Sequence, residues 1–352
     1  MDGALVYEDY VSLISKKKII STKLLNSQIQ PSSLDLSLSN ECYQVSASFL
    51  CPRCKVRDKL EKIYVKKIDI HNSKILKKNK TYIVRLNEKL ELSNSIKGHC
   101  NPKSSTGRLN IFCRTILDYS DEYEKIPINY KGEMFIEITT RSFDIKISEG
   151  DRLNQMRLTK KTHQFLDDEK LKKIHKSKPL IFSKKKNFIE NGVKVSVDLS
   201  SDKKICAYVA KKNTEVLNFS KIKKYKVSDF WEPLKATNKS LIIEKNKFYI
   251  LKSKEKIRIP NFLAGEMNPY DTGIGDFRVH YAGFFDPGFG DPNGSYAVLE
   301  VKTNELPFII EDGQTIARIK YEMLNKKTSV SYGLKIKSNY QNQKLALSKH
   351  FK

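Results

Sequence analysis

The chain has 352 residues, 39% of them hydrophobic, which suffices for two domains that each bury their own core. No run of about 18 apolar residues occurs, which excludes a membrane-spanning helix, and residues 1–18 place acids before lysines, unlike a secretory signal. We therefore expect a cytoplasmic protein. The net charge of +25 first suggests nucleic acid or an anionic membrane as partner.

The kind of basic residue argues against both partners. Only 11 of the 65 basic residues are arginine, the side chain that usually reads phosphate groups and base edges. We therefore interpret most of the charge as a solvated, lysine-rich surface that can still attract anionic substrates, and we expect neither nucleic acid nor membrane binding.

In chain order, residues 4–25 predict an N-terminal helix, and short alternating segments broken by Gly, Asn and Pro then predict strands. A lysine-rich stretch follows in mid-chain, with a short helix predicted around 166–175. A second run of short strands leads to a polar C-terminus. The expected units are a first domain, a linker, a second domain and a closing tail, at 1–158, 159–190, 191–326 and 327–352.

An internal repeat is the strongest organisational signal. Residues 74–113 align without gaps to residues 241–280, and 12 of the 40 positions are identical. Further along, residues 137–150 correspond to residues 300–313, with a Glu and a Gly 13 positions apart in both. The offset of 167 residues in the longest match is about one domain. The pattern predicts a mainly β protein, with two tandem barrel or jelly-roll domains and a few short helices.

The segment "NPKSSTGRLN" gathers groups that bind anions. Ser104, Ser105 and the backbone around Gly107 can donate hydrogen bonds to phosphate oxygens, while Lys103 and Arg108 can neutralise charge. The same residues are also ordinary turn formers. In the second copy, Asp, Thr and Gly stand where Ser104, Ser105 and Arg108 stand in the first, so the repeat does not keep these groups.

The second copy carries different chemistry. Asp286-Pro287-Gly288 predicts a turn, and Glu300 lies within the strand "YAVLEV". A strand glutamate either points to solvent or points inward, where desolvation raises its pKa and suits it to proton transfer. Glu137 holds the equivalent place in the first copy, so both glutamates are candidates.

Together these motifs resemble those of the 2'-deoxycytidine 5'-triphosphate (dCTP) deaminases, which belong to the trimeric dUTPase-like superfamily. The segment "QPSSLDLSL" at 30–38 looks like the family's opening, and Ser104-Ser105-x-x-Arg108 matches its S-S-x-x-R motif. The Asp286 turn followed by Leu299-Glu300 matches its D-P-G…L-E motif. The segment "YGLKIKSNYQNQ" at 332–343 resembles its closing tail. The resemblance covers nearly the whole chain and is closest to the long, duplicated form.

The resemblance implies a reaction. Water attacks C4 of the cytosine in dCTP, ammonia leaves and dUTP forms, with a Glu carboxylate carrying the protons. Mg²⁺ is expected on the triphosphate, and no metal is expected on the protein. No zinc is expected either, because zinc deaminases need H-x-E and P-C-x-x-C. None of the six histidines precedes x-Glu, and Cys51 follows Leu50. The pair Cys51 and Cys54 is expected to remain as free thiols.

The two copies appear incomplete in complementary ways, so we expect one composite site. The first half would supply its Ser/Arg motif, and the second half would supply Glu300 as the preferred proton shuttle, with Glu137 as its rival. Asp286 would bind the deoxyribose hydroxyl. Backbone groups of the strand from His280 to Ala282 would read the cytosine edge, with the His280 side chain mainly structural. Tail residues Tyr332 and Gln343 would contact the nucleotide. Asn339 departs from the family, which has Lys there, and Lys337 is the candidate substitute.

Two rival functions remain open. A dUTPase, or a bifunctional deaminase–dUTPase, would activate water at the α-phosphate with an Asp such as Asp118, and it would form dUMP and pyrophosphate. A nucleotide-sensing or nucleic-acid-binding module without turnover would instead show steeply salt-dependent DNA binding. The superfamily also implies self-association through a threefold arrangement, so we expect a homo-oligomer.

Overall fold

The computed structural model describes residues 2–183, 185, 187–268, 277–279, 283–303, 306–333 and 340–352, with backbone only at 277–279. Strands make up 44% of the structure and helices 12%, which confirms the predicted mainly β class. The barrel or jelly-roll form stays a prediction. No described helix is long and apolar enough to cross a membrane. The helices are short, and they are α1 (Tyr7–Ser15), α2 (Val56–Ile63), α3 (Ser104–Gly107), α4 (Asp168–Ser177), α5 (Val227–Phe230) and the 3₁₀ turn η1 (Asn26–Gln28).

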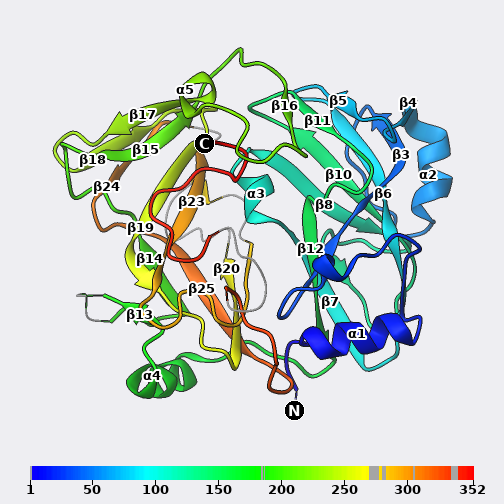
Figure 1. Ribbon diagram of the computed structural model, residues 1–352, viewed down its shortest axis with the longest axis horizontal. Helices are drawn as coiled ribbons and strands as arrows, with labels where there is room; N and C mark the ends of the chain where they lie inside the picture. Colours follow the sequence, from blue (N-terminus) through cyan, green and yellow to red (C-terminus); the bar gives the residue numbers. More distant parts are fainter. Residues whose placement is uncertain are drawn as a thin grey trace.

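The first half of the chain forms one group of sheets, on the right of Figure 1. Its largest sheet runs in the order β4 (Tyr64–Asp69), β3 (Leu38–Val45), β6 (Thr81–Glu91), β10 (Lys131–Thr140) and β8 (Ile111–Leu117), with β1 (Ile19–Ile20) also on β6. A second sheet runs β2 (Leu34–Leu36), β12 (Asn154–Lys160), β7 (Ile96–Pro102) and β9 (Lys125–Ile126). A third combines β5 (Lys74–Leu76) and β11 (Ile145–Ile147) with β16 (Leu217–Asn218), a strand that comes from the second half of the chain.

The second half forms the group on the left of Figure 1. Its largest sheet runs β17 (Trp231–Lys235), β15 (Ile205–Ala210), β19 (Tyr249–Ile257), β23 (Ser295–Thr303) and β21 (Phe277–Val279), with β13 (Ile181–Phe182) also on β19. A second sheet runs β14 (Val193–Ser196), β25 (Thr315–Met323), β20 (Leu263–Asn268) and β22 (Phe284–Phe285). A two-stranded sheet pairs β18 (Ser240–Ile243) with β24 (Phe308–Glu311).

The two large sheets therefore share one strand order, as the sequence repeat suggested. The correspondence extends to single hydrogen bonds. Ser37 donates its backbone N–H and its hydroxyl to the buried carboxylate of Glu88, and Ser196 does the same to Glu255. Glu88 and Glu255 are 167 positions apart, the offset of the repeat. Each carboxylate accepts both hydrogen bonds from one serine, so the same pair of bonds occurs in both halves.

The burial of side chains alternates along the strands, as the alternating sequence pattern predicts. Along β7, buried and half-buried residues alternate at every position, because successive side chains of a strand point to opposite faces.

The α4 helix confirms the helix predicted around 166–175, and it begins where the Asp167 carboxylate accepts the backbone N–H of Lys170 at 2.8 Å.

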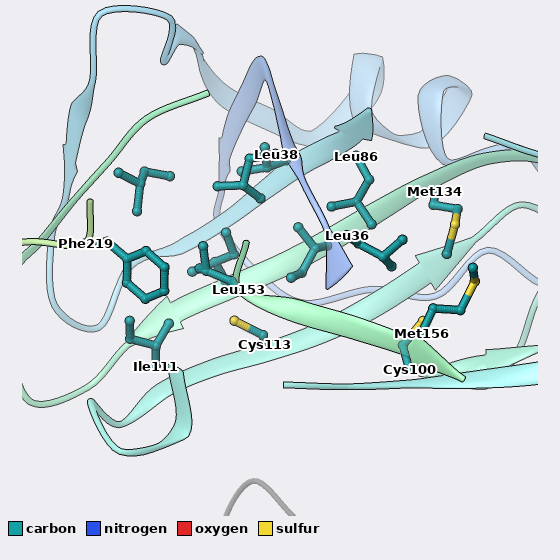
Figure 2. Close-up of a cluster of buried hydrophobic side chains, with 14 of the residues drawn as sticks. Leu36, Leu38, Leu86, Cys100, Ile111, Cys113, Met134, Leu153, Met156 and Phe219 are labelled. Carbon is teal, nitrogen blue, oxygen red and sulfur yellow. The ribbon is translucent and has the colours of Figure 1, made fainter. Parts of the chain in front are cut away.

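The core of the first half includes side chains from the second half. Figure 2 shows Phe219 packed beside Leu153 and Ile111 within this cluster. Trp231 and Phe351 join the same cluster and are buried with it. Burial of such large aromatic surfaces stabilises their packing strongly, so the two halves are joined by a shared apolar core.

The sheets that contain β7 and β20 also meet between the halves. His99 of β7 lies 2.5 Å from the carboxylate of Glu266 in β20, and these two residues occupy equivalent positions of the repeat. Ala4 bridges both halves, pairing with Thr159 on one side and Leu324 on the other. Equivalent strands of the two copies therefore come together at the centre of the molecule.

Candidate active site

A cavity lies between the two groups of sheets, and its wall combines both halves of the sequence with the C-terminal tail. In Figure 1 the red tail runs beside α3, which carries the Ser/Arg motif. Six of the residues predicted from sequence line the cavity: Ser104, Arg108, Asp286, Glu300, Tyr332 and Gln343. Apolar side chains, among them Phe284, Phe289 and Val298, complete the wall. The structure thus brings together the two incomplete motif sets within one chain.

Ser104 lines the cavity from α3, a single short helical turn that is fixed by a hydrogen bond to the chain before β12. The Thr106 hydroxyl donates to the Leu153 carbonyl at 2.7 Å, which anchors the turn to the adjoining chain. Opposite Ser104 stands Gly283, where an added Cβ would lie 3.1 Å from the Ser104 hydroxyl oxygen. A glycine at 283 therefore keeps the hydroxyl of Ser104 open to the cavity.

Arg108 is held by the tail. Its guanidinium lies 3.9 Å from the centroid of the Tyr340 ring and donates to the Gln343 side-chain carbonyl at 2.8 Å and to the Ala346 backbone carbonyl at 3.0 Å. Arg108 is 3% exposed, so these contacts replace water around most of its charge. An arginine of the first half thereby fixes the tail of the second half over the cavity.

Glu300 extends from β23 into the same cavity and is buried. Burial raises the pKa of Glu300 well above its usual value, an effect that the positive charge of Arg108 opposes only in part. One of its oxygens, Oε2, has no hydrogen-bond partner within the part of the chain that the structure describes. Such a carboxyl group keeps its proton to a higher pH than an exposed glutamate and can exchange it with a substrate.

Asp286 follows β22 in a turn where Gly288 adopts φ +92°, a conformation that favours glycine. The Asp286 carboxylate accepts the hydroxyl of Ser32 at 2.8 Å. Burial raises the pKa of Asp286, and Arg157 acts against this rise. Asp286 lines the cavity, and its carboxylate can accept a hydrogen bond from a hydroxyl group.

The two predicted tail residues take part in closing the cavity. The backbone N–H of Tyr332 donates to the Pro287 carbonyl at 2.8 Å, and its ring lies 5.8 Å from that of Phe289. Gln343 donates to the Tyr296 carbonyl at 2.8 Å while accepting from Arg108. The tail is therefore bound to the turn after β22 as well as to α3.

Other predicted residues lie elsewhere. Lys103 forms an ion pair with Asp35 and lines a separate groove. Ser105 and Gly107 are buried and are not part of the cavity wall. Glu137 is also buried outside the cavity, in a 2.7 Å ion pair with Arg114 of the neighbouring strand. His280 and Ala282 lie outside the described residues.

Sequence reasoning missed two kinds of site residue. Tyr340 stands inside the quoted tail motif, and a Tyr near a buried Arg is a recognisable cation–π signal. Ser32, in the bend before β2, and Arg157, on β12, both contact Asp286. Ser32 lies within the quoted segment at 30–38, whereas no local pattern marks Arg157. Within the described residues, no cluster of three His, Cys, Asp or Glu side chains could hold a metal ion.

Comparison with known proteins agrees with this arrangement. Residues 1–162 match the family described as 2'-deoxycytidine 5'-triphosphate deaminase (DCD) N-terminal domain, and residues 167–351 match the corresponding C-terminal domain. Among solved structures, the chain is similar to 2'-deoxycytidine 5'-triphosphate deaminase from Agrobacterium tumefaciens, with 40% sequence identity and a TM-score of 0.89. That match covers 93% of this chain and 96% of the other. No curated protein sequence matches.

Proposed function

The chain belongs to the 2'-deoxycytidine 5'-triphosphate deaminase family, and on this premise we propose that it converts dCTP and water to dUTP and ammonia. The observation that carries the proposal is the placement of Glu300 in one cavity with Ser104 and Arg108. A buried carboxyl group with a raised pKa lines this cavity together with a hydroxyl and a guanidinium. These groups can transfer protons, orient water and stabilise developing negative charge.

In the proposed reaction, Glu300 accepts a proton from water as the water oxygen forms a bond to C4 of cytosine. That proton moves to N3 of the ring. The proton of the new C4 hydroxyl then moves through Glu300 to the amino group, the C4–N bond breaks, and ammonia leaves while a carbonyl forms at C4. The raised pKa of Glu300 favours this exchange, because a carboxylate that binds its proton more tightly than an exposed glutamate is a better base and can also return the proton. Ser104 would orient the water, and Arg108 would stabilise the developing negative charge.

The remaining residues would hold the nucleotide. Asp286 would accept a hydrogen bond from the deoxyribose, Tyr332 would cover the sugar, and Gln343 would contact the nucleotide. Mg²⁺ would arrive bound to the triphosphate as part of the substrate. The proposal assigns no zinc. Self-association through the threefold arrangement of the superfamily is a separate proposal, checked by light scattering from the purified chain.

A bifunctional deaminase–dUTPase is the second candidate, because Asp118 is a carboxylate near other charged groups. Its Oδ1 accepts the backbone N–H of Val56 at 2.8 Å, and it lines a groove with Arg57 and Lys131, apart from the Glu300 cavity. Phosphate hydrolysis by Asp118 would require the nucleotide to bind at that groove. Asp118 does not line the cavity that holds Glu300, which favours deamination alone.

The test incubates Mg²⁺ and dCTP with wild type, Glu300→Gln and Glu137→Gln, and it follows ammonia and nucleotide products. Glu137→Gln is the matched control, since both glutamates are buried on equivalent strands. We expect dUTP from wild type and from Glu137→Gln, and a loss of at least about 10³-fold in Glu300→Gln.

Each other outcome has a distinct meaning. Formation of dUMP and pyrophosphate would identify the bifunctional enzyme. Loss of activity only in Glu137→Gln would move the catalytic carboxylate to the first half. Absence of dUTP from wild type would refute the deaminase proposal.

A further inference from the structure

Arg157 is a fully buried charge near the cavity, although it does not line it. It lies on β12 with 0% exposure, and its guanidinium stands 4.2 Å from the centroid of the Phe284 ring. All five N–H donors of an arginine can be used in such a site. Its acceptors, all at 2.9–3.3 Å, are the backbone carbonyls of Ser32, Gly265 and Phe285, the Ser32 hydroxyl and the carboxylates of Glu322 and Asp286.

These hydrogen bonds join the two halves beside the part of the cavity wall that carries Asp286. Arg157 and Ser32 come from the first half, whereas Asp286 comes from the turn after β22 in the second. Because a guanidinium is planar and its donors point in fixed directions, six acceptors leave Arg157 one orientation. Its position therefore determines where the turn that carries Asp286 can lie.

The two residues act on one oxygen of Asp286. Oδ1 accepts the Ser32 hydroxyl at 2.8 Å and the Arg157 Nη2 at 3.3 Å, and Ser32 in turn accepts from Arg157 at 3.1 Å. Oδ2 has no hydrogen-bond partner among the described residues. Fixing Oδ1 in this way fixes the plane of the carboxylate and leaves Oδ2 for a ligand in the cavity.

We propose that Arg157 and Ser32 are positioning residues that hold Asp286 so that its free oxygen accepts the 3'-hydroxyl of the deoxyribose. The inference rests on the proposed deamination of dCTP. It gives the first half a second task in the composite site, because the first half would then orient a sugar contact in addition to supplying Ser104 and Arg108.

Electrostatics support the same arrangement. Burial raises the pKa of Asp286, and the charge of Arg157 opposes this rise and keeps the carboxylate able to accept. Burial alone would also raise the pKa of Glu322, but Arg157 and His163 outweigh it and hold that pKa at about 2. Glu322 thus remains charged and is the second carboxylate that binds Arg157. The Ser32 hydroxyl donates to Asp286 and not to Glu322.

The experiment compares dCTP with 2',3'-dideoxycytidine 5'-triphosphate, which lacks the 3'-hydroxyl. The main variant is Ser32→Ala, which removes one bond to Asp286, and Arg157→Lys is the second, since lysine keeps the charge but loses the planar donors. Ser33→Ala is a matched control. Ser33 is equally buried, and its hydroxyl has no partner in the described part of the chain.

We expect Ser32→Ala to lower kcat/KM for dCTP about tenfold and to leave that for the dideoxy nucleotide within about twofold, mainly through KM. Arg157→Lys should lose the same discrimination, and Ser33→Ala should keep it. An equal change for both nucleotides, or no change, in Ser32→Ala would overturn the inference. Calorimetric affinities of the two nucleotides give the same decision without turnover. If wild type forms no dUTP, the proposed function fails, and these affinities still decide the role of Ser32.

Discussion

Glu137 and Glu300 stand at equivalent places in sheets of the same strand order, yet their carboxylates meet different partners. Glu137 pairs with Arg114 at 2.7 Å, and that guanidinium lies 3.6 Å from the centroid of the Tyr123 ring. Glu300 has no ion pair among the described residues, and the nearby charge of Arg108 belongs to the other half of the chain. One carboxylate is therefore neutralised within its own sheet, and the other is left in a cavity.

The comparison shows that a buried glutamate suits proton transfer when no cation forms an ion pair with its carboxylate. An adjacent cation holds a carboxylate in its charged form, which suits a structural ion pair. Desolvation without such a cation raises the pKa of Glu300, which suits proton transfer. The cation that serves the site, Arg108, arrives from the first half at the wall of the cavity and is held there by the tail.

The largest expected effect breaks the ion pair of the first half. Arg114→Met leaves the carboxylate of Glu137 buried without its cation, which should lower the free energy of unfolding by roughly 3 kcal/mol. Neither Arg114 nor Glu137 lines the cavity that holds Glu300, so kcat for dCTP should stay within about twofold of wild type. Urea unfolding and steady-state kinetics measure both quantities. A large loss of kcat with unchanged stability would contradict the separation of the two sites.

The second prediction sets the two glutamates against each other. The pKa of Glu300 is raised in the folded chain, so the folded state keeps a proton that the unfolded state loses above pH 4.5. The free energy of unfolding of wild type therefore falls as pH rises toward the folded pKa. Because Gln cannot ionise, Glu300→Gln should match the free energy of unfolding of wild type near pH 4 and exceed it at pH 8.

Glu137→Gln should have the opposite sign, because it removes one partner of an ion pair and leaves Arg114 without its carboxylate. Its free energy of unfolding should fall below that of wild type at pH 8 by roughly 1–2 kcal/mol. Thermal or urea unfolding of both variants from pH 4 to 8 tests the pair. If both variants change stability in the same direction at pH 8, the two carboxylates do not differ as the structure indicates.

The sequence predicted much of the site because its motifs are short and contiguous. The Ser/Arg turn and the strand that carries Glu300 each lie within a few residues. The repeat, over 40 aligned positions, allowed their loss or retention in each half to be compared position by position. The meeting of Ser104, Arg108 and Glu300 in one cavity agrees with the composite site predicted from that comparison. Their roles in catalysis stay predictions.

The features that were not predicted depend on long-range register. Arg114 faces Glu137 only because β8 and β10 pair with these two residues opposite each other. Lys103 lies outside the cavity because Asp35, from β2, pairs with it instead. Arg157 reaches Asp286 only once the two halves pack together. None of these partners lies close in the sequence to the residue that it controls.

The smallest expected effect concerns the aromatic ring beside each arginine. Arg108 stacks on Tyr340 and Arg114 stacks on Tyr123, so Tyr340→Leu and Tyr123→Leu remove the same kind of contact from the two places. A cation–π contact contributes roughly 1 kcal/mol, and its loss at Tyr340 should loosen the tail and raise KM for dCTP about fivefold, with kcat little changed. Tyr340→Phe keeps the ring and should stay near wild type, while Tyr123→Leu should change stability and leave KM unchanged. An equal rise of KM in both leucine variants would show that the tail contact has no special part in binding the nucleotide.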